Sequence, residues 1–272
     1  MDKITWQSIR RRDPHARPLI MAHRGSSDEA PENTLASFTL ALSQGAEVLE
    51  TDLRFTRDDE IVLIHDATVD RTTNGSGAVS EMTLVEIKKL RTRGPSPRAG
   101  LLERGGGERN EELTVKAESE ASPTLEELLQ LTRGETPLAL ELKDDRFLST
   151  RDAAALVDLL ARYGALESTV LVSFSLPRMQ TFRPIVPKLP IGMITLSNPF
   201  PLFPTEFLGP FFPLMYANPL YARWARQLGK IVCPLDPAPE PRLGYYVRLG
   251  VSVLLSNHPA RTRQALKKWY QA

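Results

Sequence analysis

Short apolar runs rich in Val, Ile and Leu recur along the chain and alternate with segments of helical periodicity. Nine runs have the length and composition of buried strands. They are 18–22, 46–53, 60–66, 137–143, 169–174, 190–196, 213–218, 230–235 and 251–257. Helices are predicted between them, over 33–45, 123–132, 151–164 and 220–229. This alternation favours a parallel sheet, either a barrel or a doubly wound sheet.

The second and third runs are joined by a connection that is too short for a parallel crossover. Too few residues lie between Asp52 and Glu60, where "TRDDE" (56–60) makes the connection, because a crossover needs about a dozen residues or more. The connection predicts a tight turn at Asp58-Asp59 and an antiparallel hairpin. Without the returning arm eight strands remain, so we predict an α/β fold, a (β/α)8 TIM barrel with a hairpin overhang after strand 2. The arm would carry His65 over the barrel mouth, where such barrels hold their chemistry.

Two segments do not fit the alternation. We expect a single domain over 1–272, with an N-terminal tail over about 1–17 and an inserted loop before strand 3 over 92–122. The inserted segment is rich in Gly, Arg and Glu and has little periodicity. It lies on the same rim as the predicted site, either as a lid or specificity loop or as a solvated excursion.

The segment 198–214, "NPFPLFPTEFLGPFFPL", holds five of the ten phenylalanines. Its prolines exclude a long helix, which predicts an apolar loop after the fifth barrel strand. The loop either packs on the barrel top as a small satellite core or forms an apolar lip. Such a lip would make a weak membrane or lipid contact and accept an acyl chain.

Composition narrows the classes of function. Lys and Arg number 34 against 33 acidic residues, so no large electrostatic field is available for nucleic acid. The single cysteine, Cys233, excludes an internal disulfide and a multi-cysteine zinc site. No apolar run reaches the roughly 18 residues of a membrane span, and no signal peptide is visible. We therefore expect a cytoplasmic protein.

Ionisable residues gather at the predicted strand ends. Glu50 and Asp52 are two positions apart and share one face of a strand, and Glu141 and Lys143 repeat this spacing. Three inward carboxylates are costly to bury unless they pair with cations or bind metal. Their oxygen donors suit a hard divalent cation, Mg²⁺ or Ca²⁺. The alternative is an ion-pair network with Lys143 and Arg24.

Two of the four histidines stand at the barrel mouth. His23 ends the first predicted strand, and His65 ends the returning arm of the hairpin. Beside a metal site, they have the character of an acid/base pair that works near neutral pH. Arg24 is suited to clamp an anionic oxygen, and Lys143 adds a point charge. Proton-transfer groups, a hard cation and fixed positive charges together match the needs of phosphodiester cleavage.

The motifs HRG, PENT, E-x-D, T-x-D, HD and RTT-x-G follow one another in this chain, and "PTLEELL" and "LALELK" come later. This order resembles the signature of the glycerophosphodiester phosphodiesterase family, within the phospholipase C-like phosphodiesterase superfamily. The resemblance covers about residues 18–80 and 122–145. It implies hydrolysis of glycerophosphodiesters, small-molecule substrates, to glycerol phosphate and an alcohol.

The resemblance also implies roles for individual residues. His23 and His65 would be the general base and the general acid. The metal ligands would be Glu50, Asp52 and Glu141, and phosphate would contact Arg24 and Lys143. Glu32 would support Arg24 or the metal shell, and we interpret Asn33 as the cap of the following helix.

The C-terminal half departs from the family pattern. "IVCPLDP" stands where the family has a Trp-Thr-Val-Asn-like motif, and "LSNHP" stands where the family has Thr-Asp-x-Pro. We expect Cys233 to be a wall or core thiol and His258 to lie at the rim. The changes remodel the pocket and leave two alternatives to the main hypothesis, lysophospholipase D-like cleavage of lysophospholipids and a catalytically silent barrel that acts as a binding module.

Overall fold

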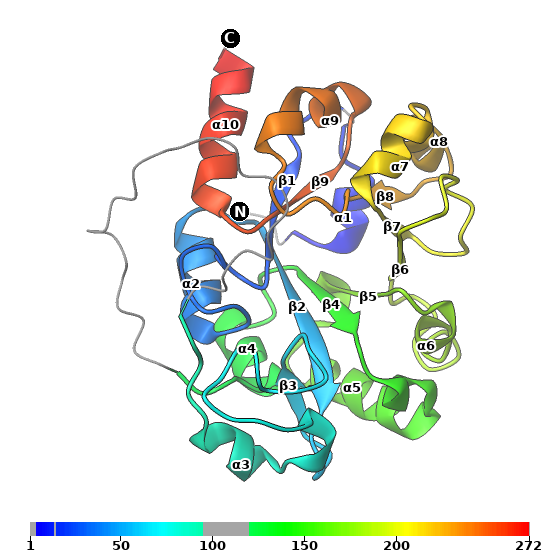
Figure 1. Ribbon diagram of the computed structural model, residues 1–272. Helices are drawn as coiled ribbons and strands as arrows, with labels where there is room; N and C mark the ends of the chain where they lie inside the picture. The colour runs from blue at the N-terminus through cyan, green and yellow to red at the C-terminus, as the bar shows by residue number, and fades with distance from the viewer. Residues whose placement is uncertain (1–3, 14, 95–119, 272) are drawn as a thin grey trace.

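The computed structural model describes residues 4–13, 15–94 and 120–271, and its centre is a nearly closed parallel barrel with helices outside it (Figure 1). The barrel order is β8-β7-β6-β5-β4-β2-β1-β9. Its strands are β1 (Leu19–His23), β2 (Val48–Phe55), β4 (Leu138–Leu142), β5 (Thr169–Ser173), β6 (Ile191–Thr195), β7 (Phe207–Pro210), β8 (Ile231–Val232) and β9 (Val253–Ser256). Between the end strands, the Ser252 amide donates to the Val232 carbonyl at 3.2 Å. The predicted (β/α)8 barrel is confirmed.

Apart from α1, which precedes β1, the helices of the described residues lie between or after the strands along the chain, and helices surround the barrel. They are α1 (Trp6–Arg10), α2 (Leu35–Ser43), α3 (Leu84–Lys89), α4 (Leu125–Thr132), α5 (Thr150–Arg162), α6 (Leu176–Gln180), α7 (Phe212–Ala217), α8 (Tyr221–Gln227), α9 (Leu243–Leu249) and α10 (Pro259–Gln271). The helices predicted from periodicity correspond to α2, α4, α5 and α8. Short 3₁₀ turns lie at Val79–Glu81, Asp145–Leu148, Leu166–Ser168 and Glu240–Arg242.

The hairpin overhang is also confirmed. Strand β3 (Ile61–Leu63) runs antiparallel to the end of β2, with Phe55 opposite Ile61. The chain reverses at Asp59, whose φ of 68° is left-handed, a conformation that Asp tolerates better than most residues. The Ile64 amide then donates to the Asp52 carbonyl at 3.2 Å, which brings the returning arm back to the barrel mouth.

The predicted strand at 213–218 is wrong, because residues 213–217 lie in helix α7 and Asn218 is its C-cap. Pro213 stands in the first turn of α7, where a missing N–H costs nothing. The barrel strand is instead β7, Phe207–Pro210, inside the segment that was predicted to be a loop. This four-residue run is buried along its whole length, and a run so short has no readable periodicity.

The predicted N-terminal tail contains an ordered element, helix α1, which packs at the amino end of the barrel. Trp6 is buried, and its indole N–H donates to the carbonyls of Leu138 and Ser168 at 3.1 and 2.9 Å. Its ring meets the Phe207 ring edge-on, with the centroids 5.6 Å apart. The aromatic side chain therefore joins this segment to the barrel.

The predicted insertion over 92–122 lies largely outside the described residues, since 95–119 are not described. Its described ends meet, because the Thr92 amide donates to the Glu120 carbonyl at 2.8 Å. Within the described ranges, no helix is long and apolar enough to cross a bilayer.

Candidate active site

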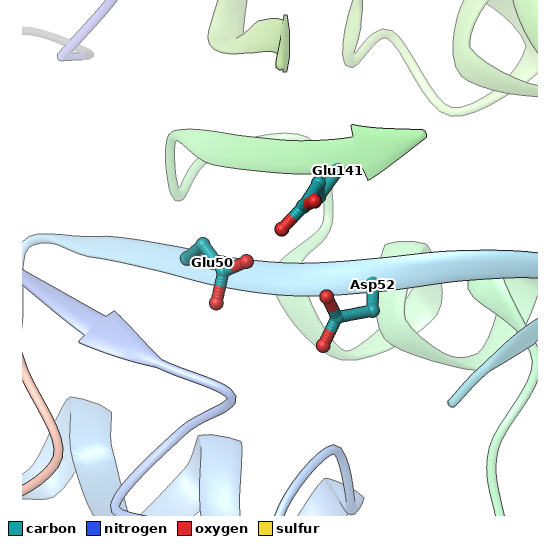
Figure 2. Close-up of side chains that lie close together, drawn as sticks. All are labelled: Glu50, Asp52 and Glu141. Carbon is teal, nitrogen blue, oxygen red and sulfur yellow. The ribbon is translucent and has the colours of Figure 1, made fainter. Parts of the chain in front are cut away.

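Three carboxylates meet at the carboxyl end of β2 and β4, as predicted. Asp52 is paired with Glu141 across the two strands, and Glu50 lies two residues before Asp52 on the same face. Figure 2 shows the three side chains pointing toward one another. An oxygen of each lies within 4.8 Å of the others, and all three residues are buried.

Burial, mutual repulsion and the neighbouring cations Arg24 and Lys143 determine the electrostatics of the cluster. Burial and the charge of Asp52 raise the pKa of Glu50 well above its ordinary value, and raise that of Glu141 to about 7. Burial also opposes ionisation of Asp52, but the neighbouring cations hold its pKa below the ordinary value. Asp52 Oδ1 accepts no hydrogen bond from the described residues. Lys143 Nζ lies 3.4 Å from it, and an oxygen without a hydrogen bond in an all-oxygen donor set fits a hard divalent cation.

Asn33 orients the central carboxylate, a role that its sequence position did not reveal. Its amide donates to Asp52 Oδ2 at 3.0 Å, and the Thr51 hydroxyl donates to Asn33 Oδ1 at 2.8 Å. The predicted capping role is wrong, because Thr34 is the N-cap of α2 and accepts from the Ser37 amide. Asn33 itself has a φ of 57°, which turns its side chain from the helix to the carboxylate.

Arg24 lies directly against the cluster. Its backbone amide donates to the carbonyl and to Oε2 of Glu50, both at 3.1 Å. Its guanidinium donates to Glu32 Oε1 at 3.1 Å, and its Nε lies 3.1 Å from Asp52 Oδ2. The predicted support of Arg24 by Glu32 is therefore present as an ion pair.

Arg71, within the RTT-x-G motif, is a residue that the sequence reasoning gave no role. It donates to both oxygens of Glu32 at 2.8 and 2.7 Å and to Asp66 Oδ2 at 2.6 Å. Glu32 thus holds two arginines, Arg24 and Arg71, and ties the hairpin arm to the loop after β1. Its position in the RTT-x-G motif was the sequence signal that could have identified Arg71 as a site residue.

His23 ends β1, opposite Glu50 in the strand register. Its Nδ1 lies 2.7 Å from the Asn257 amide oxygen, after β9. Since that oxygen only accepts, Nδ1 carries the proton and Nε2 does not. Burial, and then the charge of Arg24, lower the pKa of His23 to about 3, so its imidazole is neutral at physiological pH.

His65 follows β3 and is held by its carbonyl and its ring. Arg54 donates twice to the His65 carbonyl, at 3.0 and 2.8 Å. His65 Nδ1 lies 2.6 Å from Asp66 Oδ1. Burial lowers the pKa of His65, while Asp52 and the hydrogen bond to Asp66 raise it. The His65 side chain is 32% exposed, so a ligand can reach the ring.

Lys143, the last predicted site residue, follows β4. Its Nζ lies 2.7 Å from Glu141 Oε1 and 3.4 Å from Asp52 Oδ1. On its other side it lies 5.7 Å from the centroid of the Phe174 ring. The structure therefore brings the cationic side chains and the carboxylates together. The catalytic and binding roles given to these residues remain predictions.

A cavity of about 400 Å³, open to solvent, lies at this end of the barrel. His23, Glu50 and Glu141 line it, together with Cys233, Pro234 and Leu235. The atypical "CPL" stretch therefore forms pocket wall. Burial raises the pKa of the Cys233 thiol, which keeps it protonated and unreactive.

The remaining polar residues of the atypical motifs have structural contacts. Asp236 is buried and accepts hydrogen bonds from Arg242 at 2.6 and 2.7 Å and from the Tyr246 hydroxyl at 2.6 Å. His258, at the start of α10, has its Nδ1 3.5 Å from Glu29 Oε2. Of these motifs, Asn257 is the side chain that touches a predicted catalytic residue.

Comparison with known proteins agrees with this geometry. Residues 23–199, well over half of the chain, match the model of the glycerophosphoryl diester phosphodiesterase family. A glycerophosphodiester phosphodiesterase of Caldanaerobacter subterraneus is 35% identical over 177 residues. The match covers 65% of this chain and 66% of that protein, just under two thirds of its length.

Solved structures share the fold. A glycerophosphodiester phosphodiesterase from Agrobacterium tumefaciens is 25% identical, with a TM-score of 0.70, and the match covers 90% of this chain and 98% of that one. A phosphodiesterase from Oleispira antarctica, solved with the product sn-glycerol-3-phosphate, is 24% identical with a TM-score of 0.74. That match covers 92% of this chain and 97% of the other.

Proposed function

The chain belongs to the glycerophosphoryl diester phosphodiesterase family, and from this premise we propose that it hydrolyses glycerophosphodiesters to glycerol phosphate and an alcohol. The observation that carries the proposal is the cluster of three buried carboxylates, within 4.8 Å of one another, beside His23 at an open pocket. Carboxylates, imidazoles and cations around one pocket suit an anionic substrate whose cleavage needs proton transfer.

The proposed reaction depends on a divalent cation, Mg²⁺ or Ca²⁺. Glu50, Asp52 and Glu141 would hold it, because their donors are all oxygens and Asp52 Oδ1 has no hydrogen bond from the described residues. When bound, such a cation polarises a phosphoryl oxygen and lowers the pKa of an attacking hydroxyl.

The two histidines divide the proton transfers. His23 accepts at Nε2 the proton of the attacking water or substrate hydroxyl, because Asn257 holds Nδ1 and the imidazole is neutral. His65 donates a proton to the departing alcohol, with Asp66 at its Nδ1 to favour the protonated ring. Each histidine thus has one nitrogen held by the protein and one left for substrate.

The cations orient the phosphate. Arg24 is fixed by Glu32 and Asp52, so its remaining N–H groups are presented in one orientation. Lys143 Nζ lies on the other side of Asp52. Positive charge on both sides of the reacting phosphorus offsets the charge that develops on its oxygens. A silent barrel is disfavoured, since both histidines and all three carboxylates are retained.

The test is hydrolysis of glycerophosphocholine with Mg²⁺ or Ca²⁺, followed by detection of glycerol phosphate and choline. We expect turnover by the wild type and a loss of about 10²–10⁴-fold in His23→Ala and in His65→Ala. Circular dichroism checks that both variants fold. Folded variants with wild-type rates would refute the acid/base roles, and an inactive wild type would refute the function.

The cellular location that we propose is the cytoplasm, on the basis of a single buried thiol and no cysteine pair. Fractionation of cells that express the protein tests this location. Activity in the membrane fraction or the secreted fraction would contradict it.

A further inference from the structure

A second cavity lies at the amino end of the barrel, away from the predicted catalytic residues. Its volume is about 400 Å³, and it lies where the segment after α1 meets the turns that precede β8 and β9. Most of the polar side chains that line it are cationic. They are Arg10, Arg12, Arg17, Arg226 and Lys230. Among the described residues of the lining, Asp13 is the one acidic side chain. The cavity therefore has an excess of positive charge, which favours an anionic ligand.

The basic run "RRR", Arg10 to Arg12, contributes two of these cations. It stands at the end of α1, which the buried Trp6 joins to the barrel, so the run is held beside the cavity. The Arg10 Nε–H donates to the Gly229 carbonyl. A Cβ at Gly229 would lie 2.8 Å from the Arg10 guanidinium, so this close approach needs a glycine. This wall of the cavity is thus a defined structure.

The cations of the cavity are bonded mainly to neutral groups. Arg12, Arg226 and Lys230 each donate to backbone carbonyls. The acceptors are Arg17 for Arg12, at 3.1 Å, Leu249 for Arg226, at 3.4 Å, and Thr205 for Lys230, at 2.6 Å. Within the part of the chain that the structure describes, Arg17 is the one lining cation with an ion pair, to Glu47. A carbonyl accepts a hydrogen bond but leaves the positive charge uncompensated.

Positive charge at the cavity is concentrated enough to affect a neighbouring lysine. Burial lowers the pKa of Lys230, and the charge of Arg10 lowers it further, against an opposing effect of Glu206. The Glu206 carboxylate is itself bound by Arg183, at 2.7 Å from each of its oxygens. The like charges of the cavity therefore repel one another, and an anion bound among them would offset the repulsion.

We propose that this cavity binds a diphosphate group, as free pyrophosphate or as the terminal group of a small organic diphosphate. Planar guanidinium groups match phosphate oxygens two at a time, and the lysine adds a point charge. Cations from three segments surround more space than one phosphate fills, whereas two linked phosphates carry more charge and reach further. The described lining has no aromatic ring to stack on a base, so the diphosphate itself is the recognised group. This binding site goes beyond the proposed hydrolysis and does not depend on it.

The cavity lies at the seam where the barrel closes. Ser252 lines it, and the Ser252 amide donates to the Val232 carbonyl between the two end strands of the sheet. Lys230 directly precedes β8. A ligand held by Arg12, Arg226 and Lys230 would join the segment after α1 to this seam, so we expect binding to stabilise the folded chain.

The first experiment measures pyrophosphate binding by calorimetry on metal-free protein. It compares Arg12→Gln/Arg226→Gln with Arg11→Gln/Arg223→Gln, which removes exposed arginines of the same two segments that lie outside the lining. Both variants lose the same charge. We expect the Kd of pyrophosphate to rise about 10-fold or more in the first variant and by less than about 2-fold in the second. Equal losses in the two variants overturn the proposal, since a diffuse surface charge would explain them, and so does a wild type that does not bind.

Thermal melting checks that the variants fold, and pyrophosphate should raise the melting temperature of the wild type but not that of Arg12→Gln/Arg226→Gln. If this double variant does not fold, Arg12→Gln is compared with Arg11→Gln, and we expect a rise in Kd of about 3-fold or more in Arg12→Gln alone. Equal Kd values for these two single variants overturn the proposal.

Arg24→Gln and two further ligands complete the test. Arg24→Gln should bind pyrophosphate as tightly as the wild type, whereas weaker binding there, with full binding in Arg12→Gln/Arg226→Gln, places the anion in the catalytic pocket and overturns the proposal. Inorganic phosphate should bind about 10-fold more weakly than pyrophosphate, and equal affinity overturns the choice of a diphosphate. ADP that binds as tightly as pyrophosphate supports an organic diphosphate, and weaker ADP binding supports the free ion.

Discussion

His23 Nδ1 and the Asn257 amide oxygen lie 2.7 Å apart, so the first and last strands of the barrel jointly set the state of one imidazole. We expect Asn257→Leu to lower kcat by about 10–100-fold, because the ring loses the acceptor that keeps Nε2 unprotonated and correctly aimed. KM should change much less than kcat. Steady-state kinetics on glycerophosphocholine measures both.

Asn257→Asp is the matched variant for this prediction. A carboxylate also accepts from Nδ1, so most of the activity should be retained. Thermal melting separates a local effect from unfolding. An Asn257→Leu enzyme with wild-type kcat would mean that His23 needs no partner at Nδ1.

The contact between His65 and Asp66 predicts a shift in the pH dependence of the reaction. Burial lowers the pKa of His65, and the hydrogen bond from its ring to Asp66 raises it. Asp66→Asn removes the carboxylate that raises the pKa of His65, so this pKa falls. A general acid acts only while protonated, and therefore the alkaline limb of kcat/KM against pH should move to lower pH. The measurement is a pH–rate profile of wild type and variant.

Asp70→Asn is the control for that profile, because the Asp70 carboxylate accepts from the Ser76 hydroxyl and the Gly77 amide, at 2.8 and 3.1 Å, rather than from His65. The pH–rate profile of Asp70→Asn should match that of the wild type. If the profile of Asp66→Asn also superimposes on that of the wild type, His65 is not the general acid.

The carboxylate cluster predicts that Mg²⁺ or Ca²⁺ stabilises the folded chain. Glu141, whose pKa burial raises to about 7, must lose its proton to bind a cation, so affinity should fall as the pH drops below that value. A cation at 100 times its Kd contributes about 2.7 kcal/mol. For a chain of this size the melting temperature should rise by about 5–10 °C.

Glu141→Gln should abolish this shift, and Glu60→Gln, at an exposed position of the hairpin, should retain it. Scanning calorimetry after chelation and metal addition measures the shifts, and the same samples are assayed for turnover. Full activity in excess chelator would remove the cation from the mechanism.

The carboxylate cluster could be predicted because two simple rules determine it, the alternation of side chains along a strand and the meeting of parallel strands at their carboxyl ends. Glu50 and Asp52 share a face by alternation, and the carboxyl ends of parallel strands meet at one edge, which brings in Glu141. Asn33 could not be assigned in the same way. Two capping residues stand side by side, and only the left-handed backbone at Asn33 sends its amide to Asp52 and leaves Thr34 to cap.

Short apolar runs explain the wrong strand in the second half of the barrel. Phe207–Pro210 and Phe212–Ala217 are adjacent and both apolar, and neither is long enough for its period to be read. Tertiary pairing decides between them, since Met193 and Ile194 on β6 pair with Leu208 and Gly209. Arg71 was missed for a related reason, because its partners come from loops that periodicity does not describe.

The position of Trp6 in the segment predicted to be a tail yields the last prediction. Its side chain is 2% exposed and its N–H is shared by two carbonyls from different strand ends, at Leu138 and Ser168. We expect Trp6→Ala to lower the free energy of unfolding by about 3–5 kcal/mol, through the lost burial and the cavity. Trp6→Phe keeps most of the packing and loses only the hydrogen bonds, at a cost of about 1–2 kcal/mol. Gln7→Ala, at an exposed position of the same helix, should cost little. Denaturant unfolding followed by circular dichroism measures all three variants, and a Trp6→Ala protein as stable as Gln7→Ala would mean that α1 contributes nothing to the barrel.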